Sequence, residues 1–207
     1  MGGIKTDSVF LEIICVTYSR PKELRVLVGS LACQTNLSFI LRIIHDGPSA
    51  ETRECVVDLQ KVYPEITIIY QETENRFNDL GDSLRAKGLM DSVYEYVLLT
   101  NDDNYYVPVF VQEIQEMIEQ ESADIIYYDM VHNYAFSHSP NPIPYQLFIT
   151  EPRVNFIDIG SFVFKGQLGK TVGYHARSYN ADGLFFEELK ATGAKITKIP
   201  KVLFVHN

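Results

Sequence analysis

The stretch YEYVLLTNDDNYYVP, Tyr94–Pro108, joins an apolar run to four consecutive small polar residues. The apolar part, residues 96–99, predicts a buried strand, and the polar part behind it contains two adjacent carboxylates, Asp102 and Asp103. Neighbouring carboxylates repel each other unless a cation lies near them. The stretch therefore predicts a cation-binding position at the end of a buried strand.

Strands and amphipathic helices alternate on the N-terminal side of this stretch, and one more helix follows it. The expected strands cover residues 9–16, 38–46, 65–73 and 94–104. The expected helices cover residues 21–34, 50–63, 80–93 and 107–120, two of them with a proline in the first turn. This alternation predicts right-handed βαβ units, and hence an α/β fold with a mostly parallel, Rossmann-like sheet flanked by helices.

The C-terminal part of the chain is less regular. Strands are expected at 124–134 and 160–166, and a helix is expected at 182–194 before closing strands in 195–207. A polar, proline-rich connection, residues 137–155, has the composition of an active-site loop. Because no repeat or linker interrupts the pattern, we expect a single domain over residues 1–207.

Bulk composition narrows the class of protein. The formal net charge of −9 argues against binding nucleic acid or an anionic membrane through general electrostatics, since both require a basic surface. No apolar run reaches the length of a membrane span. The three cysteines lack metal-type spacing, which is typical of buried thiols in a reducing cytoplasm.

Polar residues stand at the carboxyl ends of three of the expected strands. Thr17 and Tyr18 follow the first, Asp46 ends the second, and Asn101–Asn104 end the fourth. In open parallel sheets, ligands bind beyond the carboxyl ends of the strands. Asp46 alone is explained equally well by an Asp-Gly turn, whereas the adjacent carboxylates are not. Oxygen ligands of this kind suit Mg²⁺ or Mn²⁺, which take further ligands from water and a diphosphate.

Three segments in this order resemble a family 2 glycosyltransferase of the GT-A fold. They are ICVTYSRPKELRVLVGSLACQT, residues 14–35, IIHDGPS, residues 43–49, and GDSLRAKGLMDSVYEYVLLTNDDNYYVP, residues 81–108. The resemblance extends from about Leu11 to the C-terminus. It implies transfer of a sugar from a nucleoside diphosphate sugar to an acceptor hydroxyl, with inversion and with a divalent metal. It also implies a cytoplasmic enzyme of polysaccharide biosynthesis, whose partners are the donor and a carbohydrate or other hydroxyl acceptor.

The resemblance divides the chain into a nucleotide-binding half, about residues 9–106, and an acceptor and catalytic half, about residues 107–207. In the first half, Thr17 and Tyr18 would hold the nucleoside base, and Asp46 would accept a hydrogen bond from it. Arg20 and Arg85 would approach the nucleotide, with Arg85 as the local cation that this acidic chain needs.

The diacid takes the place of the family's metal-binding motif. By that match Asp102 contacts the ribose or the metal's hydration shell, and Asp103 is the direct metal ligand. On the residues alone, either carboxylate remains open as the ligand, because Asp-Asp-Asn stands where Asp-x-Asp is common. A second departure is His45, which stands before Asp46 where relatives often have another aspartate.

The inverting reaction requires a base that removes the acceptor hydroxyl proton, and a carboxylate is the usual choice. Asp182 lies just ahead of the last expected helix, in the position of the family's acidic motif, although an Asp there also suits a helix N-cap. His206 matches a position that supplies a metal ligand in several GT-A enzymes, or it is an ordinary strand end. Further positions for donor sugar and acceptor are Asp158, Gly160 and Ser161, with His138 as an acceptor residue.

One other function remains open, and two more are disfavoured by the sequence. An inactive relative that binds a nucleotide sugar without turnover shares the fold and ligand, so the fold alone does not exclude it. A nucleotidyltransferase is disfavoured because TYSRPKEL, residues 17–24, lacks the glycine-rich loop of that class. A nicotinamide-dependent enzyme is disfavoured because no G-x-G-x-x-G follows the first strand.

Overall fold

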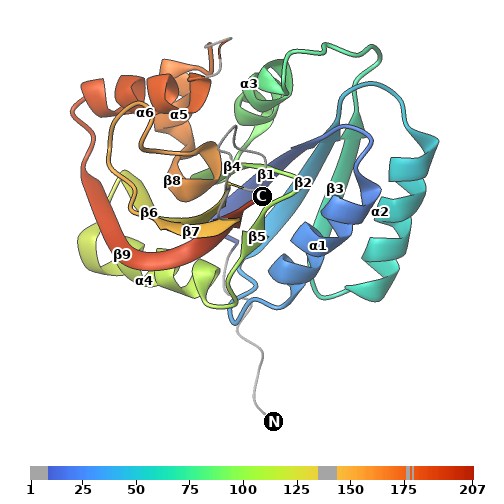
Figure 1. Ribbon diagram of the computed structural model, residues 1–207, viewed down its shortest axis with the longest axis horizontal. Coiled ribbons are helices and arrows are strands. Elements are labelled where there is room, and N and C mark those ends of the chain that lie inside the picture. Colours follow the sequence, from blue (N-terminus) through green and yellow to red (C-terminus); the bar gives the residue numbers. More distant parts are fainter. Residues whose placement is uncertain (1–8, 135–143, 176–177, 179) are drawn as a thin grey trace.

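The computed structural model describes residues 9–134, 144–175, 178 and 180–207 (Figure 1). One curved sheet runs through this part of the chain, in the strand order β3-β2-β1-β4-β8-β6-β9-β5, with β7 paired to β6. The α/β fold predicted from the sequence is thus confirmed. Among the described residues, no helix is long and apolar enough to span a bilayer.

The N-terminal half of the sheet is parallel throughout. Its strands are β1 (Leu11–Thr17), β2 (Phe39–His45), β3 (Thr67–Glu72) and β4 (Tyr96–Asn101). All residues of β1 and β2 are buried, as their nearly continuous apolar sequence predicts for strands that are covered on both faces. The parallel register sets Thr17 beside His45 and Val16 beside Asn101, so these strands end at one edge.

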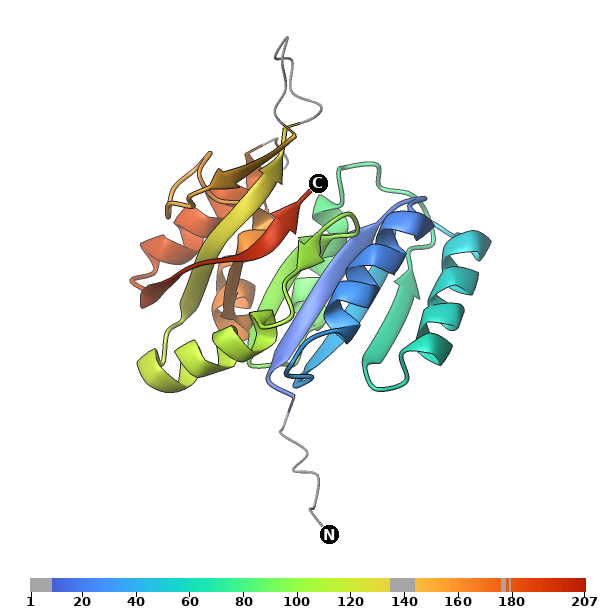
Figure 2. The ribbon, with the colours of Figure 1, turned by 60° about the horizontal axis from the view of Figure 1, so that its bottom comes forward.

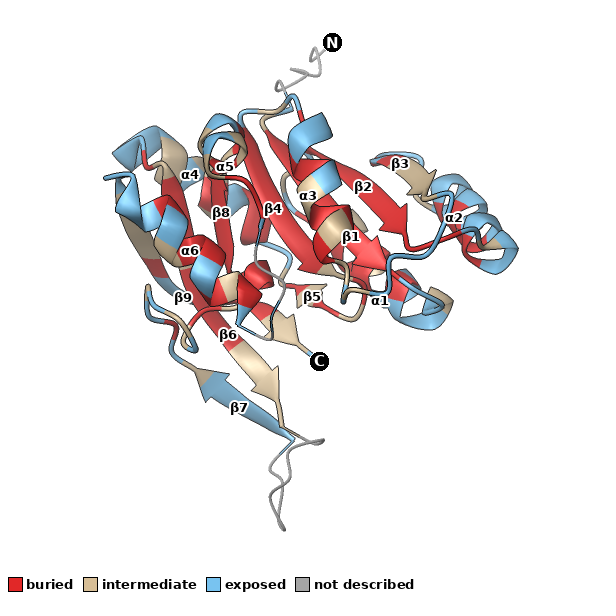
Figure 3. Cartoon of the chain, turned by 90° about the horizontal axis from the view of Figure 1, so that it is seen from above, coloured by how far each residue is buried: buried red, intermediate tan, exposed pale blue. Residues whose placement is uncertain are grey.

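Helices cover both faces of the sheet (Figure 2). One face packs against α1 (Pro21–Ala32), α2 (Ala50–Val62) and α4 (Phe110–Glu121), and the other against α3 (Asp82–Asp91), α5 (Gly166–Val172) and α6 (Ala181–Ala191). Pro21 occupies the first turn of α1, where its missing N–H costs nothing. Ser49 caps α2 by accepting a hydrogen bond from the Thr52 amide at 3.1 Å. Figure 3 shows the resulting layers, with buried strands between helices whose outer faces are exposed.

The C-terminal half of the sheet mixes directions. β8 (Phe162–Lys165) is antiparallel to both β4 and β6 (Ile125–Asn133), and β9 (Ile196–His206) is parallel to β6. β9 is a single strand of 11 residues, where the sequence predicts more than one closing strand. Its pairing with β6 shifts register between Tyr128 and Met130, where β9 contains Pro200, which has no N–H to give the ladder.

Four short elements are not predicted by the sequence pattern. They are β5 (Tyr105–Tyr106), β7 (Tyr145–Phe148), the 3₁₀ turn η1 (Ile159–Ser161) and α5. The two glycines of α5 lower its helix propensity, so its sequence does not indicate a helix. Gly169 is required by close packing, because a Cβ there would lie 2.3 Å from the Phe164 ring. β7 occupies part of the predicted active-site loop. Residues 137–143 of that loop, His138 included, lie outside the described residues.

Candidate functional site

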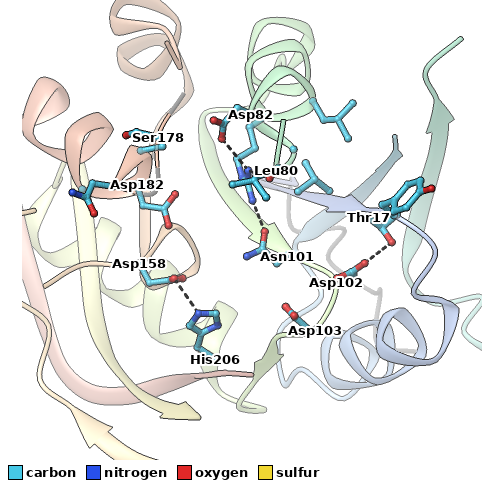
Figure 4. A pocket seen from close by; sticks show the side chains of 18 of the residues that line it. Thr17, Leu80, Asp82, Asn101, Asp102, Asp103, Asp158, Ser178, Asp182 and His206 are labelled. Atoms are coloured by element: carbon cyan, nitrogen blue, oxygen red, sulfur yellow. Dashed lines mark hydrogen bonds and ion pairs between the residues drawn. The ribbon is translucent and has the colours of Figure 1, made fainter. Parts of the chain in front are cut away.

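A cavity of about 860 Å³ opens at the carboxyl ends of the parallel strands, between the two halves of the chain (Figure 4). Of the predicted site residues that the structure describes, all but Gly160 and Ser161 line it: Thr17, Tyr18, Arg20, Asp46, Arg85, Asp102, Asp103, Asp158, Asp182 and His206. The cavity is large enough for a cofactor-sized ligand. Residues as far apart in the sequence as Thr17 and His206 thus meet at one site, as the strand-end rule predicts.

One side of the cavity, which we call the diacid wall, consists of Thr17, Arg20, Asp102 and Asp103. The Thr17 hydroxyl donates to Asp102 Oδ2 at 2.5 Å, so Thr17 positions this carboxylate. Arg20 Nη1 lies 2.6 Å from Asp103 Oδ2 and 3.4 Å from Asp102 Oδ1. The guanidinium of Arg20 is therefore the cation that balances the adjacent carboxylates in this structure.

Two further features indicate that negative charge on the diacid wall is only partly compensated. Burial raises the pKa of Asp102 to about 6, despite the Thr17 hydroxyl and Arg20, and the charge of Asp103 adds to the shift. Asp103 Oδ1 is buried and has no hydrogen-bond partner among the described residues. A buried carboxylate oxygen without a partner is costly, so this wall is suited to receive a cation or a donor group.

Asp46 anchors a loop beside the diacid wall. Its carboxylate accepts hydrogen bonds from the amides of Phe77 at 2.7 Å and Asn78 at 3.0 Å, and it is only 5% exposed. Arg76, from the same loop, lies 3.7 Å from Asp46 and stacks on the ring of Tyr18, with its guanidinium carbon 3.5 Å from the ring centroid. The position predicted for a nucleoside base is thus lined by a ring, a carboxylate and a guanidinium.

Sequence reasoning did not find Arg76. It lies in the connection between β3 and α3, so the strand-end rule that selects Asp46 could have selected it as well. The lining also includes four residues that the sequence did not single out, which belong to β6, to β7 and to the position directly after β6: Met130, His132, Tyr134 and Phe148.

Arg85 is a cation of the site, but it also supports the loop before its own helix. It is 5% exposed, and it donates to the Leu80 carbonyl at 2.8 Å and to the Asn101 side chain. Its Nε is buried without a hydrogen-bond partner among the described residues. The turn before α3 requires a glycine at position 81, because its φ is +86° and a Cβ there would lie 2.8 Å from the Val16 side chain.

The opposite side of the cavity, the Asp158–Asp182 wall, carries two carboxylates and His206. Asp182 lies in the first turn of α6, whose N-cap is Asn180, so it does not cap the helix. It accepts instead from the Ile159 amide at 3.3 Å and from the Tyr174 hydroxyl at 3.2 Å. Burial raises the pKa of Asp182, and the charge of Asp158 raises it further. A carboxylate with a raised pKa is a better proton acceptor at neutral pH.

Gly160 and Ser161 lie behind this wall rather than on it. Both are buried, and the Gly160 carbonyl accepts hydrogen bonds from Tyr106 at 3.1 Å and Tyr128 at 2.8 Å. The Ser161 hydroxyl donates to the Asp158 carbonyl at 2.7 Å. The two residues support the turn that presents Asp158, so the structure does not place them against a donor sugar or acceptor.

The two walls meet near Asp103 and His206. Strand β5, directly after the diacid, pairs with the end of β9, and the Asn207 side chain donates to the Asp103 carbonyl at 2.7 Å. His206 Nε2 lies 3.6 Å from Asp158 Oδ2, while its Nδ1 is buried and has no hydrogen-bond partner among the described residues. A carboxylate oxygen suits Mg²⁺ or Mn²⁺, and an imidazole nitrogen is a common ligand of first-row transition metals.

A complete metal centre is not formed by protein groups alone. Within the described ranges, no three His, Cys, Asp or Glu side chains are close enough together to hold an ion. Mg²⁺ in particular is commonly bound by one or two carboxylates, with the remaining ligands from water and substrate phosphates. The residues present therefore fit a metal that arrives with a diphosphate.

Comparison with known proteins gives concordant results. The sequence profile described as "Glycosyl transferase family 2" matches residues 12–176. An uncharacterized glycosyltransferase of Haemophilus influenzae is 30% identical over 146 residues, which is 68% of this chain and 47% of that protein. The uncharacterized glycosyltransferase YwdF of Bacillus subtilis is 26% identical over 119 residues, 58% of this chain and 41% of that protein. The matched regions thus amount to less than half of these relatives.

Solved structures share the fold. The crystal structure of S. aureus TarS 1–349 superposes with a TM-score of 0.74 at 18% identity, over 96% of this chain and 60% of that one. The same fragment has been solved in complex with UDP and with UDP-GlcNAc. The mannosyltransferase PcManGT of Pyrobaculum calidifontis, in complex with GDP-Man and Mn²⁺, gives a TM-score of 0.72 at 13% identity, over 97% and 57% of the two chains.

Proposed function

This chain belongs to glycosyl transferase family 2, and from that premise we propose that it transfers a sugar from a nucleoside diphosphate sugar to an acceptor hydroxyl with inversion, with Mn²⁺ or Mg²⁺. One observation carries the proposal. A single cavity brings a diacid with an unpartnered oxygen to one side and a carboxylate of raised pKa, Asp182, to the other. Metal-assisted departure of a diphosphate and removal of a hydroxyl proton require these two groups.

The donor would lie along the diacid wall. Tyr18, Asp46 and Arg76 supply stacking and hydrogen-bonding groups for a nucleoside base, and Arg20 and Arg85 supply positive charge near the diphosphate. The similar folds that bind UDP, UDP-GlcNAc and GDP-Man support a nucleotide sugar as the ligand class. We retain residues 9–106 as the nucleotide-binding half on this basis.

Asp103 and His206 would hold the metal, with Asp102 beside it. The metal, when bound, acts as a Lewis acid that stabilises charge on the leaving diphosphate. Arg20 contacts the other Asp103 oxygen, Oδ2, and Asp102 Oδ1, so its guanidinium has to move aside for a metal that takes either of these two oxygens. Its side chain is 52% exposed, which leaves room for that movement.

Asp182 would accept the proton from the acceptor hydroxyl. The amide of Ile159 and the hydroxyl of Tyr174 hold the carboxylate toward the cavity through two long hydrogen bonds. In an inverting reaction the nucleophile attacks from the side opposite the leaving group, so the base belongs on the wall that faces the diacid. This assignment keeps residues 107–207 as the acceptor and catalytic half, in a single domain of 207 residues.

A binder that does not turn over its ligand is the alternative of a different class. Hydrolysis of the donor separates the two: an enzyme releases nucleoside diphosphate slowly even without an acceptor, in a metal-dependent manner, whereas a binder does not. A nucleotidyltransferase would instead release pyrophosphate from a nucleoside triphosphate, so the same assay with triphosphates tests that class.

The proposal is tested by thermal unfolding with UDP, GDP, CDP, ADP and dTDP and their sugars, each with and without Mn²⁺. We expect one nucleotide to raise the melting temperature, and to do so more strongly with Mn²⁺, because a ligand that binds only the native state stabilises it. A hundredfold excess over Kd corresponds to about 2.7 kcal/mol of stabilisation. If no nucleotide changes the melting temperature under any condition, the proposed function is wrong.

A further inference from the structure

His45 occupies an unusual place at the edge of the site. It is the last residue of β2, beside Thr17 at the end of β1. The side chain is 1% exposed and does not line the cavity. Its ring lies 5.7 Å from the ring of Tyr18, measured between centroids. A buried polar ring in this position needs hydrogen-bond partners.

Both nitrogens of the ring have a backbone partner. The Ser19 amide donates to Nε2 at 3.2 Å, and Nδ1 lies 2.7 Å from the carbonyl oxygen of Gly47. An amide N–H can only donate, so Nε2 must be unprotonated, and Nδ1 then carries the hydrogen that is donated to Gly47. A single neutral tautomer therefore satisfies both contacts.

The two partners belong to turns that need support. Ser19 has a φ of +53° and Gly47 a φ of +90°. The left-handed region is unfavourable for a residue with a side chain, so the conformation of Ser19 depends on contacts such as the one to His45. Gly47 is also held from the far side, where its amide donates to the Thr73 hydroxyl at 2.7 Å.

These turns carry the groups that line the donor side of the cavity. Tyr18 and Arg20 flank Ser19, and Asp46 precedes Gly47. We propose that His45 is a positioning residue that ties the two turns together and so sets the affinity for the nucleoside diphosphate without contacting it. The inference rests on the proposed function and assigns a role to a residue that neither binds the metal nor acts as the base.

Three variants separate the two hydrogen bonds. In His45→Gln, the side-chain oxygen can reach the position of Nε2 and accept from Ser19. In His45→Asn, the shorter amide can reach the position of Nδ1 and donate to Gly47. His45→Phe keeps an aromatic ring of similar size and removes both hydrogen bonds. Because each amide variant retains one bond, each is a matched control for the other.

The experiment is a calorimetric titration with UDP, GDP, CDP, ADP and dTDP in the presence of Mn²⁺, followed by steady-state donor hydrolysis. We expect His45→Phe to weaken binding of the recognised nucleotide about 10- to 100-fold, and each amide variant to weaken it less. We expect His45→Gln to bind more tightly than His45→Asn, since the Ser19 contact supports both Tyr18 and Arg20. The donor KM should rise while kcat changes less than about twofold.

Outcomes of this experiment separate positioning from folding. A variant that is partly unfolded lowers the number of binding sites in the titration, whereas a misplaced turn raises Kd at unchanged stoichiometry. If His45→Phe has the Kd of the unaltered protein, or loses only sites, the inference is wrong while the proposed function stands. If the unaltered protein binds none of the five nucleotides, the proposed function fails and this inference fails with it.

Discussion

On the diacid wall, Asp102 and Asp103 share the guanidinium of Arg20, whereas on the Asp158–Asp182 wall burial and the charge of Asp158 raise the pKa of Asp182. Of the described residues, only the His206 imidazole forms an ion-pair contact on that second wall, with Asp158 at 3.6 Å. A carboxylate that already has a mobile cation can exchange it for a metal. The pKa is raised for both Asp102 and Asp182, but only Asp182 lacks an ion pair with a described residue, so Asp182 is the better placed to accept a proton.

The largest effect that would sharpen this contrast is expected from Asp182→Asn. It should lower kcat for transfer or donor hydrolysis by about 10²- to 10⁴-fold, because the amide cannot accept the proton. The nucleotide Kd should not change, since Asp182 lies on the other wall. The matched control is Glu188→Gln, an exposed carboxylate of the same helix, which should retain normal turnover. Normal turnover in Asp182→Asn would show that the base is elsewhere.

Asp102→Asn tests the cost of the buried charge on the diacid wall. The folded pKa of Asp102, about 6, lies above the unfolded value, so the folded state binds this proton more tightly. Stability is therefore lost as pH rises from about 4 to about 6 and stays low above it. We expect the variant to be more stable at pH 7 by about 1–3 kcal/mol, and the difference to shrink near pH 4. Urea unfolding at both pH values measures it; a less stable variant at pH 7 would contradict the account.

The pH dependence of turnover tests the pair on the other wall. Because the base acts only when it is deprotonated, kcat/KM should fall as the pH drops through the raised pKa of Asp182. Asp158→Asn removes the neighbouring charge, so the acid limb should move to lower pH, by about one unit or less. The Asn side-chain oxygen can still accept the hydrogen bond that the Gly160 amide donates to Asp158 Oδ1 at 2.8 Å. An acid limb that moves to higher pH would show that Asp158 does not act through its charge.

The smallest effect is expected from Arg20→Gln. Without the guanidinium, no cationic side chain of a described residue competes with the metal for the two carboxylates. Mn²⁺ should therefore bind the nucleotide-free protein about two- to fivefold more tightly. The effect is small because Arg20 is half-exposed and its ion pairs are screened by water. Electron paramagnetic resonance of free Mn²⁺ measures it. Weaker Mn²⁺ binding in the variant would mean that Arg20 supports the metal site rather than competing for it.

The sequence predicts the parallel half of this molecule better than the mixed half. Continuous apolar strands and proline-initiated helices, such as β1 and α1, follow local rules that a sequence displays. The short elements depend on contacts across the fold instead. The two residues of β5 are a strand only because Tyr105 and Tyr106 pair with Val205 and Phe204.

The same distinction holds within the site. Asp46, Asp102 and Asp103 lie at the ends of predicted strands, so the strand-end rule finds them. Arg76 lies within a loop whose path is set by hydrogen bonds to Asp46, and His45 acts through backbone groups of two turns. Such roles depend on backbone conformation, which residue types alone do not reveal. The position of Gly160 behind the wall, against Tyr106 and Phe204, is likewise a product of packing.

The most direct test of the division between the walls is Mn²⁺ binding by Asp103→Asn and Asp182→Asn, each titrated with the recognised nucleoside diphosphate present. We expect Asp103→Asn to lose Mn²⁺ binding while remaining folded, and Asp182→Asn to bind Mn²⁺ within about twofold of the unaltered protein. If Asp103→Asn binds Mn²⁺ normally, or Asp182→Asn loses it, the metal does not belong to the diacid wall.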